Sequence, residues 1–213
     1  MKIGILLGSF DPVHINHVEL ISEVLNLNLV DRVLVCPTYQ NPWKTEASAP
    51  FELRCQMLDA ALEPLQEIFP GRVLVNDYEK NFEPPTYSYK ILNLIRKNST
   101  NDDLYIICGA DLIPAIKDWK NYEQDIQPNF KYIMFTREED NKGISIAKAS
   151  LPYFNTEINM EGITVTKRSS DLSSSIIRDR IKKGLCPYPL INKGVFDIIK
   201  KGHLYGYGEK RKS

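Results

Sequence analysis

Three features are missing from this sequence of 213 residues: a net charge, a long apolar run and closely spaced cysteines. Lys plus Arg and Asp plus Glu each total 27, so the formal net charge is zero. The protein therefore has no overall basic field that would attract nucleic acid or an anionic membrane, and we expect neither as a partner. No stretch approaches the roughly 18 apolar residues that a membrane-spanning helix requires. Any phosphate group that binds here must be held by a local site.

The four cysteines lie at positions 36, 55, 108 and 186, and no C-x-x-C pair occurs. This spacing argues against a disulfide framework and favours a reducing compartment. The N-terminal apolar run is too short for the core of a signal peptide. With 43% hydrophobic and 25% charged residues, the composition is that of an ordinary globular protein. We therefore expect a cytoplasmic, globular protein.

Short apolar runs rich in Ile, Val and Leu alternate with longer amphipathic stretches. Several runs are apolar at consecutive positions, which is typical of strands buried on both faces of a parallel sheet. The expected strands are residues 3–7, 32–36, 73–75, 104–108, 132–135 and 163–165, and the expected helices are 17–27, 51–65, 87–95, 174–183 and 195–201. Strands separated by helices of this length form βαβ units, so we expect an α/β fold with a Rossmann-like, doubly wound parallel sheet.

The sequence indicates one domain over residues 1–205, in which about 172–205 form a small C-terminal helical part. Residues 37–50 carry three prolines after a predicted strand, which predicts a surface loop. Residues 136–159 are polar and irregular, and we assign no element there. Residues 206–213 are rich in Gly and Lys, which predicts a flexible tail. The sequence leaves the oligomeric state open, and a homo-oligomer is one of the alternatives.

The first loop after a predicted strand is Gly8-Ser-Phe-Asp-Pro-Val-His14-Ile-Asn-His17. In open parallel sheets ligands bind at the carboxyl ends of the strands, so a site is expected here. The loop has neither a G-x-G-x-x-G fingerprint nor a Walker A sequence. Instead, one glycine lets the backbone approach a ligand, and two histidines share one face at the start of the next helix. A helix N-terminus with such donors beside it suits a phosphate group.

Two other interpretations of the histidine pair stay open on the residues alone. His14 and His17 could supply two ligands of a metal site, but no cysteine or carboxylate cluster completes it at the usual spacing. They could also be ordinary solvated or capping histidines. The position of the pair after the first strand favours phosphate, and we expect no metal held by protein ligands.

A second candidate site is the run Ser173-Ser174-Ser175-Ile176-Ile177-Arg178, at the start of a predicted amphipathic helix. Serines are typical N-cap residues, and capping alone would explain one of them. Hydroxyl and free N–H groups at a cap also bind phosphate, and an arginine in the first turn donates paired hydrogen bonds to its oxygens. Two phosphate-binding helix starts in one chain are more specific than either alone.

Together the two runs resemble the signatures of the nucleotidyltransferase α/β-phosphodiesterase superfamily, G-x-F-x-P-x-H-x-x-H and I-S-S-T-x-I-R. Asn16 stands where bacterial members usually have glycine, and Leu172 and Ser175 replace the Ile and Thr of the second signature. Within that superfamily, further segments resemble the nicotinate/nicotinamide mononucleotide adenylyltransferases. These segments are residues 41–44, 54–58, 85–92, 108–111 with Trp119, and 189–205.

The resemblance implies transfer of the adenylyl group of ATP to nicotinate mononucleotide, which yields deamido-NAD and pyrophosphate, with Mg²⁺ bound to ATP. His14, His17 and Arg178 would be catalytic. ATP would be bound by Gly8, Ser9, Phe10, His14, His17, Gly109, Asp111, Ser173, Ser174, Ile176 and Arg178. The mononucleotide would be bound by Lys44, Thr86, Tyr87, Ser88 and Trp119, with the Trp119 indole stacked on the pyridine ring.

Other functions fit part of the same pattern. Nicotinamide mononucleotide, or both mononucleotides, would be accepted if the pyridine substituent met acceptors as well as donors. Pantetheine-phosphate adenylyltransferases share both signatures, but their chains are usually shorter and lack the Trp119 segment. A non-catalytic nucleotide sensor would be expected to have lost a phosphate ligand, whereas His14, His17, Ser174 and Arg178 are all present.

Overall fold

The computed structural model describes residues 1–40, 42, 47–109, 112–135 and 172–208. Its centre is a parallel sheet of five strands in the order β3-β2-β1-β4-β5. The strands are β1 (Lys2–Gly8), β2 (Arg32–Pro37), β3 (Val73–Val75), β4 (Asp103–Gly109) and β5 (Lys131–Phe135). This order confirms the expected doubly wound sheet, and the expected strand 163–165 lies outside the described residues. The loop after β2 starts one residue later than expected, because Pro37 still pairs with Gly8.

The expected helices are present, with shifted ends. They are α1 (Ile15–Asn26), α2 (Phe51–Ile68), α3 (Ser88–Asn98), α6 (Ser174–Lys182) and α7 (Lys193–Lys201). Shorter helical turns are η1 (Tyr78–Asn81), α4 (Ile113–Ile116), the π-helical turn η3 (Tyr122–Ile126) and η4 (Leu204–Gly206). Among the described residues, no helix is both long and apolar enough to cross a bilayer.

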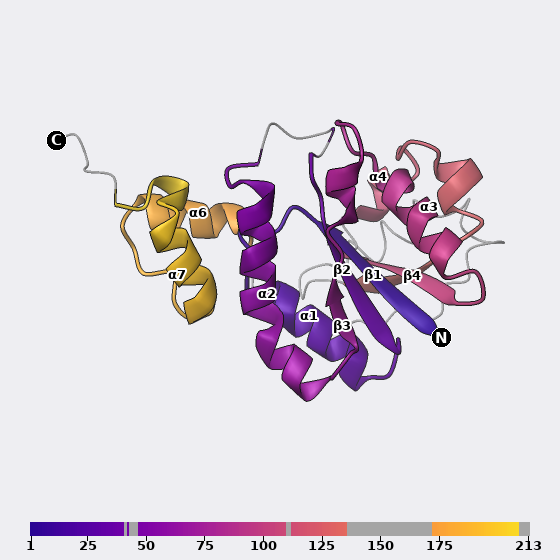
Figure 1. Ribbon diagram of the computed structural model, residues 1–213, viewed down its shortest axis with the longest axis horizontal. Coiled ribbons are helices and arrows are strands. Elements are labelled where there is room, and N and C mark those ends of the chain that lie inside the picture. Colours follow the sequence, from indigo (N-terminus) through magenta and orange to yellow (C-terminus); the bar gives the residue numbers. More distant parts are fainter. Residues whose placement is uncertain (41, 43–46, 110–111, 136–171, 209–213) are drawn as a thin grey trace.

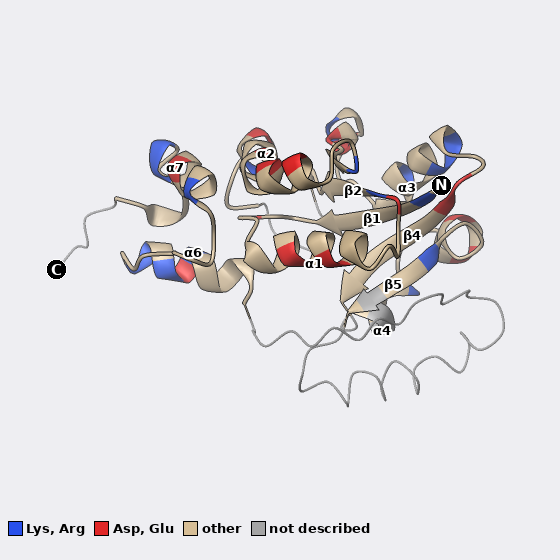
Figure 2. Ribbon diagram, turned by 90° about the horizontal axis from the view of Figure 1, so that it is seen from below, with Lys and Arg blue, Asp and Glu red and all other residues tan. Residues whose placement is uncertain are grey.

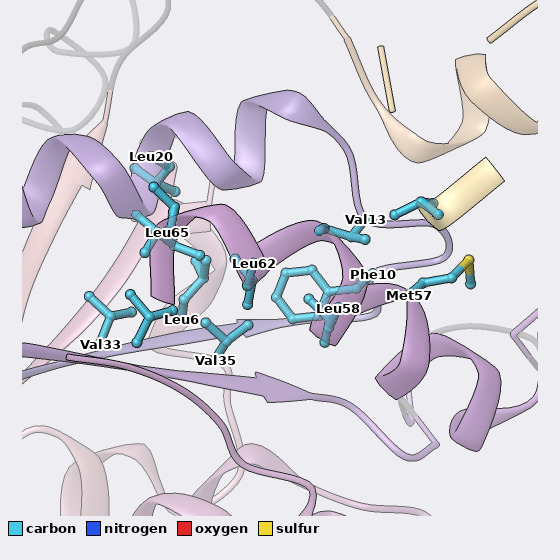
Figure 3. Close-up of a cluster of buried hydrophobic side chains, with 14 of the residues drawn as sticks. Leu6, Phe10, Val13, Leu20, Val33, Val35, Met57, Leu58, Leu62 and Leu65 are labelled. Atoms are coloured by element: carbon cyan, nitrogen blue, oxygen red, sulfur yellow. The ribbon is translucent and has the colours of Figure 1, made fainter. Parts of the chain in front are cut away.

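The sheet separates two hydrophobic cores, because successive strand residues point to opposite faces. On one face Leu6, Val33 and Val35 pack with α1 and α2, and Figure 3 shows these side chains interleaved with Leu58 and Leu62. On the other face Ile5 and Ile106 pack with α3, α4 and η3. Burial on both faces explains why the strands are apolar at consecutive positions.

The C-terminal helices α6 and α7 lie at the end of the molecule away from the N-terminus, with α7 beside α2 (Figure 1). Helix α7 approaches α2 so closely that a Cβ on Gly194 would lie 3.0 Å from the Cβ of Ala60. The Asn192 side chain caps α7 by accepting from the N–H of Val195, and it donates to the carbonyl of Ala60 at 2.7 Å. These contacts fix the C-terminal part against the sheet domain.

Candidate active site

The strand order reverses between β1 and β4, which is where open α/β sheets bind ligands. Gly8 ends β1 and Gly109 ends β4, and these two strands are neighbours in the sheet. Both glycines are half-buried, so the backbone is reachable at the carboxyl edge. Two residues that were expected at this edge, Lys44 and Asp111, lie outside the described residues.

The turn after β1 is built around the Phe10 ring. Phe10 has a φ of 47°, in the left-handed region that side chains rarely adopt, and is only 2% exposed. Its ring lies under Gly8, where an added Cβ would be 3.0 Å from Cζ of Phe10. A side chain at position 8 would therefore press against the Phe10 ring, which belongs to the core. Only the backbone of Ser9 and Phe10, together with the half-buried Ser9 side chain, is left to face a nucleotide.

His14 and His17 lie together at the start of α1. His14 is the N-cap residue, with extended backbone angles, and the two imidazole rings stack with centroids 3.8 Å apart. The backbone N–H of His14 donates to Nδ1 of His17 at 3.3 Å. Because Nδ1 of His17 accepts this bond, its neutral ring carries the proton on Nε2. His17 therefore presents an N–H donor from Nε2, which is the group a phosphate oxygen requires.

The second serine-rich run lies directly against the first turn. The Ser174 hydroxyl donates to the carbonyl of Pro12 at 2.8 Å, and the Arg178 guanidinium donates to the carbonyl of Asp11 at 2.7 Å. The N-termini of α1 and α6 are thus held next to each other at the carboxyl end of β1. Ser174 and Arg178 therefore contact the turn that leads directly into His14 and His17.

The prediction that a serine caps α6 is only partly confirmed. Ser173 does occupy the N-cap position, but its hydroxyl makes no cap hydrogen bond to the backbone and instead lies 2.8 Å from the hydroxyl of Ser175. Ile176 is exposed at the same helix start. Figure 2 shows that basic residues are frequent on α6 and α7, whereas α1 carries only acidic charges. The α6 side of the site thus carries more basic charge than the α1 side.

A buried carboxylate and a buried guanidinium hold the loops around this turn, and sequence reasoning assigned no role to either. Both oxygens of Asp11 accept backbone N–H groups, from Ser48 at 2.8 Å and from Ala49 at 3.1 Å. Arg54 is 1% exposed and donates to the carbonyls of Ser9, Thr38, Tyr39 and Ala49. Burial lowers the pKa of Arg54, against the effect of the Asp11 charge. One signal was available, namely a charged residue on the apolar face of α2.

The Thr86 side chain is structural. It is 1% exposed, and its hydroxyl bonds to the carbonyl of Gln40 at 3.0 Å and to the carboxylate of Glu79 at 2.8 Å. Glu79 is also buried and accepts from the N–H of Tyr39 at 2.8 Å. Burial raises the pKa of Glu79, and these two hydrogen bonds partly oppose the shift. Thr86 therefore fixes the segment before α3 to the loop after β2.

The other residues expected at the mononucleotide lie near the N-terminus of α3. Tyr87 is the N-cap of α3, Ser88 is its first residue, and both are half-buried. The ammonium group of Lys120 lies 4.5 Å from the centre of the Tyr87 ring, which joins this segment to the one that follows Trp119. Trp119 itself is half-buried and packs against the core that contains α3. The structure thus places the Tyr87 and Trp119 segments side by side.

The sheet order, the turn under Gly8 and the paired helix N-termini are those of an α/β nucleotidyltransferase domain. Comparison with known proteins agrees, because residues 5–180 match the cytidylyltransferase-like family. A "Probable nicotinate-nucleotide adenylyltransferase" of a Nitratiruptor species is 31% identical over 200 residues, covering 94% of this chain and 99% of that protein. A protein of the same name from Clostridium tetani is 31% identical over 207 residues, covering 96% and 98%.

The chain therefore belongs to the cytidylyltransferase-like family, within the group of nicotinate-nucleotide adenylyltransferases that these relatives represent. Among solved structures, the Plasmodium falciparum nicotinic acid mononucleotide adenylyltransferase complexed with NaAD superposes with a TM-score of 0.79. At 22% identity, with 98% of this chain and 99% of that chain covered, this likeness shows a shared fold.

Proposed function

We propose that the protein transfers the adenylyl group of ATP to nicotinate mononucleotide, forming deamido-NAD and pyrophosphate. The observation that carries the proposal is the pair of hydrogen bonds from Ser174 and Arg178 to the turn after β1. They place the N-termini of α1 and α6 beside one another, so two donor-rich helix starts face one anionic ligand. The names of the relatives support the same activity.

The reaction needs positioning and charge stabilisation from the protein. A 5′-phosphate oxygen of the mononucleotide forms a bond to the α-phosphorus of ATP, and the bond from that phosphorus to the bridging oxygen breaks as pyrophosphate leaves. The attacking oxygen is already anionic, so no general base is required. Nε2–H of His17 would donate to the transferring phosphate, with His14 beside it. The β- and γ-phosphates would be bound at the start of α6, by the backbone N–H groups at Ser174 and by N–H groups of Arg178 other than the one that bonds to Asp11.

Roles for the remaining residues rest on their positions in the structure and, for Lys44 and Asp111, which lie outside the described residues, on the resemblance to the family. The backbone at Gly8–Phe10 and at Gly109 would approach ATP, with Asp111 on a ribose and Ser173 and Ile176 at the start of α6. Lys44 would bind the phosphate of the mononucleotide. Tyr87 and Ser88 would face the pyridine substituent, and Trp119 would stack on the ring. Thr86 would contribute by positioning this segment, since its hydroxyl is bonded within the protein.

Mg²⁺ is expected to arrive with ATP. Within the described ranges, no three His, Cys, Asp or Glu side chains lie close enough together to hold a metal ion. Asp11, a carboxylate within the turn after β1, is engaged by the N–H groups of Ser48 and Ala49. The described residues thus fit a Mg²⁺ ion that is carried by ATP and would neutralise phosphate charge. The protein groups named above would then orient the phosphates.

Lys120 favours nicotinate over nicotinamide as the pyridine. Nicotinate carries a carboxylate where nicotinamide carries a neutral amide, so a cation near the ring substituent discriminates between them. Lys120 directly follows Trp119, and its ammonium group already reaches the Tyr87 ring at 4.5 Å. One positive charge thus lies beside Tyr87, a residue expected at the pyridine, and it would pair with the acid and gain little from the amide.

The test is product formation with Mg-ATP and one acceptor at a time: nicotinate mononucleotide, nicotinamide mononucleotide or phosphopantetheine. We expect deamido-NAD and pyrophosphate in equal amounts, with the highest kcat/KM for the nicotinate compound. Lys120→Gln should lower the preference for the acid about fivefold, with Lys117→Gln as the matched surface control. Equal rates with both mononucleotides would indicate dual specificity. Turnover of phosphopantetheine alone would refute the proposal.

A further inference from the structure

A residue from the far end of the chain contacts the turn that carries the phosphate-binding residues. The hydroxyl of Tyr205 donates to Oδ1 of Asp11 at 2.8 Å, across 194 positions of sequence. Tyr205 lies in the short turn η4, after the last helix of the C-terminal part. Its φ of 58° is in the left-handed region, which costs an L-residue on the order of 1 kcal/mol. The backbone is thus held in an unfavourable conformation that delivers this side chain to Asp11.

Asp11 connects Tyr205 to both substrate loops. Its backbone belongs to the turn between Gly8 and His14, and its carbonyl accepts from Arg178. Its carboxylate accepts the N–H groups of Ser48 and Ala49, which end the loop that runs from β2 to α2. The ATP side and the mononucleotide side of the site therefore meet at one carboxylate, and Tyr205 supplies its third hydrogen bond.

We infer that Tyr205 is a positioning residue, which fixes the Asp11 carboxylate and thereby sets the spacing of the ATP turn and the mononucleotide loop. The expected effect on the rate of transfer rests on the proposed function, whereas the positioning of Asp11 rests on the hydrogen bonds alone. Burial, followed by the neighbouring Asp11 charge, raises the pKa of the Tyr205 hydroxyl, so it stays a donor. In a transfer between two bound nucleotides, misplacement of one relative to the other reduces the rate of the chemical step.

The experiment compares Tyr205→Phe with Tyr207→Phe, two residues away in the same C-terminal segment. The Tyr207 ring packs on Phe196 with centroids 5.7 Å apart, so this control removes a nearby phenol hydroxyl that is outside the described contacts of Asp11. We expect Tyr205→Phe to lower kcat about tenfold, with the KM of each substrate within about twofold of wild type. Tyr207→Phe should match wild type. A purely structural Tyr205 would lower the folded fraction and leave kcat per folded molecule unchanged, which would overturn the inference.

Two further measurements keep the test decisive. Amide hydrogen exchange at Ser48 and Ala49 should be about tenfold faster in Tyr205→Phe than in Tyr207→Phe, and equal exchange would contradict the contact. If Tyr205→Phe folds poorly, p-aminophenylalanine and p-methylphenylalanine at position 205 replace it, since they match tyrosine in size. Only the amino group donates a hydrogen bond, so only that variant should recover wild-type kcat. A wild-type protein inactive on every pyridine mononucleotide would refute the proposed function, whereas the exchange measurement would still test Tyr205.

Discussion

Among the arginines on the described helices, Arg54 should be the one whose replacement destabilises the protein most. Its guanidinium is buried on α2 and donates to four backbone carbonyls, those of Ser9 at 2.6 Å, Thr38 at 2.8 Å, and Tyr39 and Ala49 at 3.2 Å each. These carbonyls belong to the turn after β1 and to both ends of the loop between β2 and α2. Arg54→Met keeps much of the length of the side chain and removes every donor.

The magnitude follows from the contacts. A hydrogen bond to a charged group contributes about 1.5–3 kcal/mol, but four bonds from one side chain are not additive. The desolvation of the guanidinium, which costs several kcal/mol, is also relieved when the charge is removed. We therefore expect the free energy of unfolding to fall by about 3–5 kcal/mol, the range for breaking a buried ionic network. Arg54→Lys should recover little, because an ammonium group cannot reach four carbonyls in the guanidinium geometry.

The assay is urea unfolding followed by circular dichroism, with Arg72→Met as the matched control. Arg72 makes the same kind of contact nearer the surface, to the carbonyls of Asp31 at 2.7 Å and Val30 at 3.2 Å. Its loss should cost about 1 kcal/mol. If Arg54→Met were as stable as Arg72→Met, the four carbonyls would not depend on the guanidinium and the reasoning would be wrong.

Two further predictions concern Glu79 and Gly8, which support the candidate site. Burial raises the folded-state pKa of Glu79 above its ordinary 4.5. The stability of wild type relative to Glu79→Gln should therefore decline as the pH rises from 4.5 through that raised pKa. Urea unfolding measures this difference, with Glu83→Gln at an exposed position as the control. A pH-independent difference would contradict the burial effect. Gly8→Ala places a Cβ 3.0 Å from the buried Phe10 ring, a tight contact. If the turn yields, the KM for ATP should rise about tenfold in initial-rate kinetics. An unchanged KM would mean that the ring can move aside.

Much of the sheet could be predicted because local pattern and tertiary environment agree. Runs such as residues 104–108 are apolar on both faces, and only a covered parallel sheet buries them. Helix starts were less accurate, since α1 begins at Ile15 and not at residue 17. The extended backbone of His14 sets that start, and a histidine is not a usual cap signal.

The candidate phosphate-binding side chains could be chosen from the sequence because each lies within a short signature. The contacts that position them could not, because they join distant segments through backbone carbonyls. Ser174 meets Pro12 across 162 positions, and nothing in either local sequence specifies that bond. The Thr86 hydroxyl was expected at the ligand, yet it is bonded to Glu79, whose burial depends on the fold of η1. The positions of Lys44 and Asp111 stay predictions.

The most direct test of the account is the kcat of His17→Ala in adenylyl transfer, measured beside His203→Ala. The chain has three histidines, and His203 is an exposed residue of the C-terminal turn. If Nε2–H of His17 stabilises the transferring phosphate, its loss should cost about 3 kcal/mol, a fall in kcat of at least about 100-fold. The melting temperature should change little, and His203→Ala should match wild type. A folded His17→Ala protein with kcat within about threefold of wild type would contradict this role of His17.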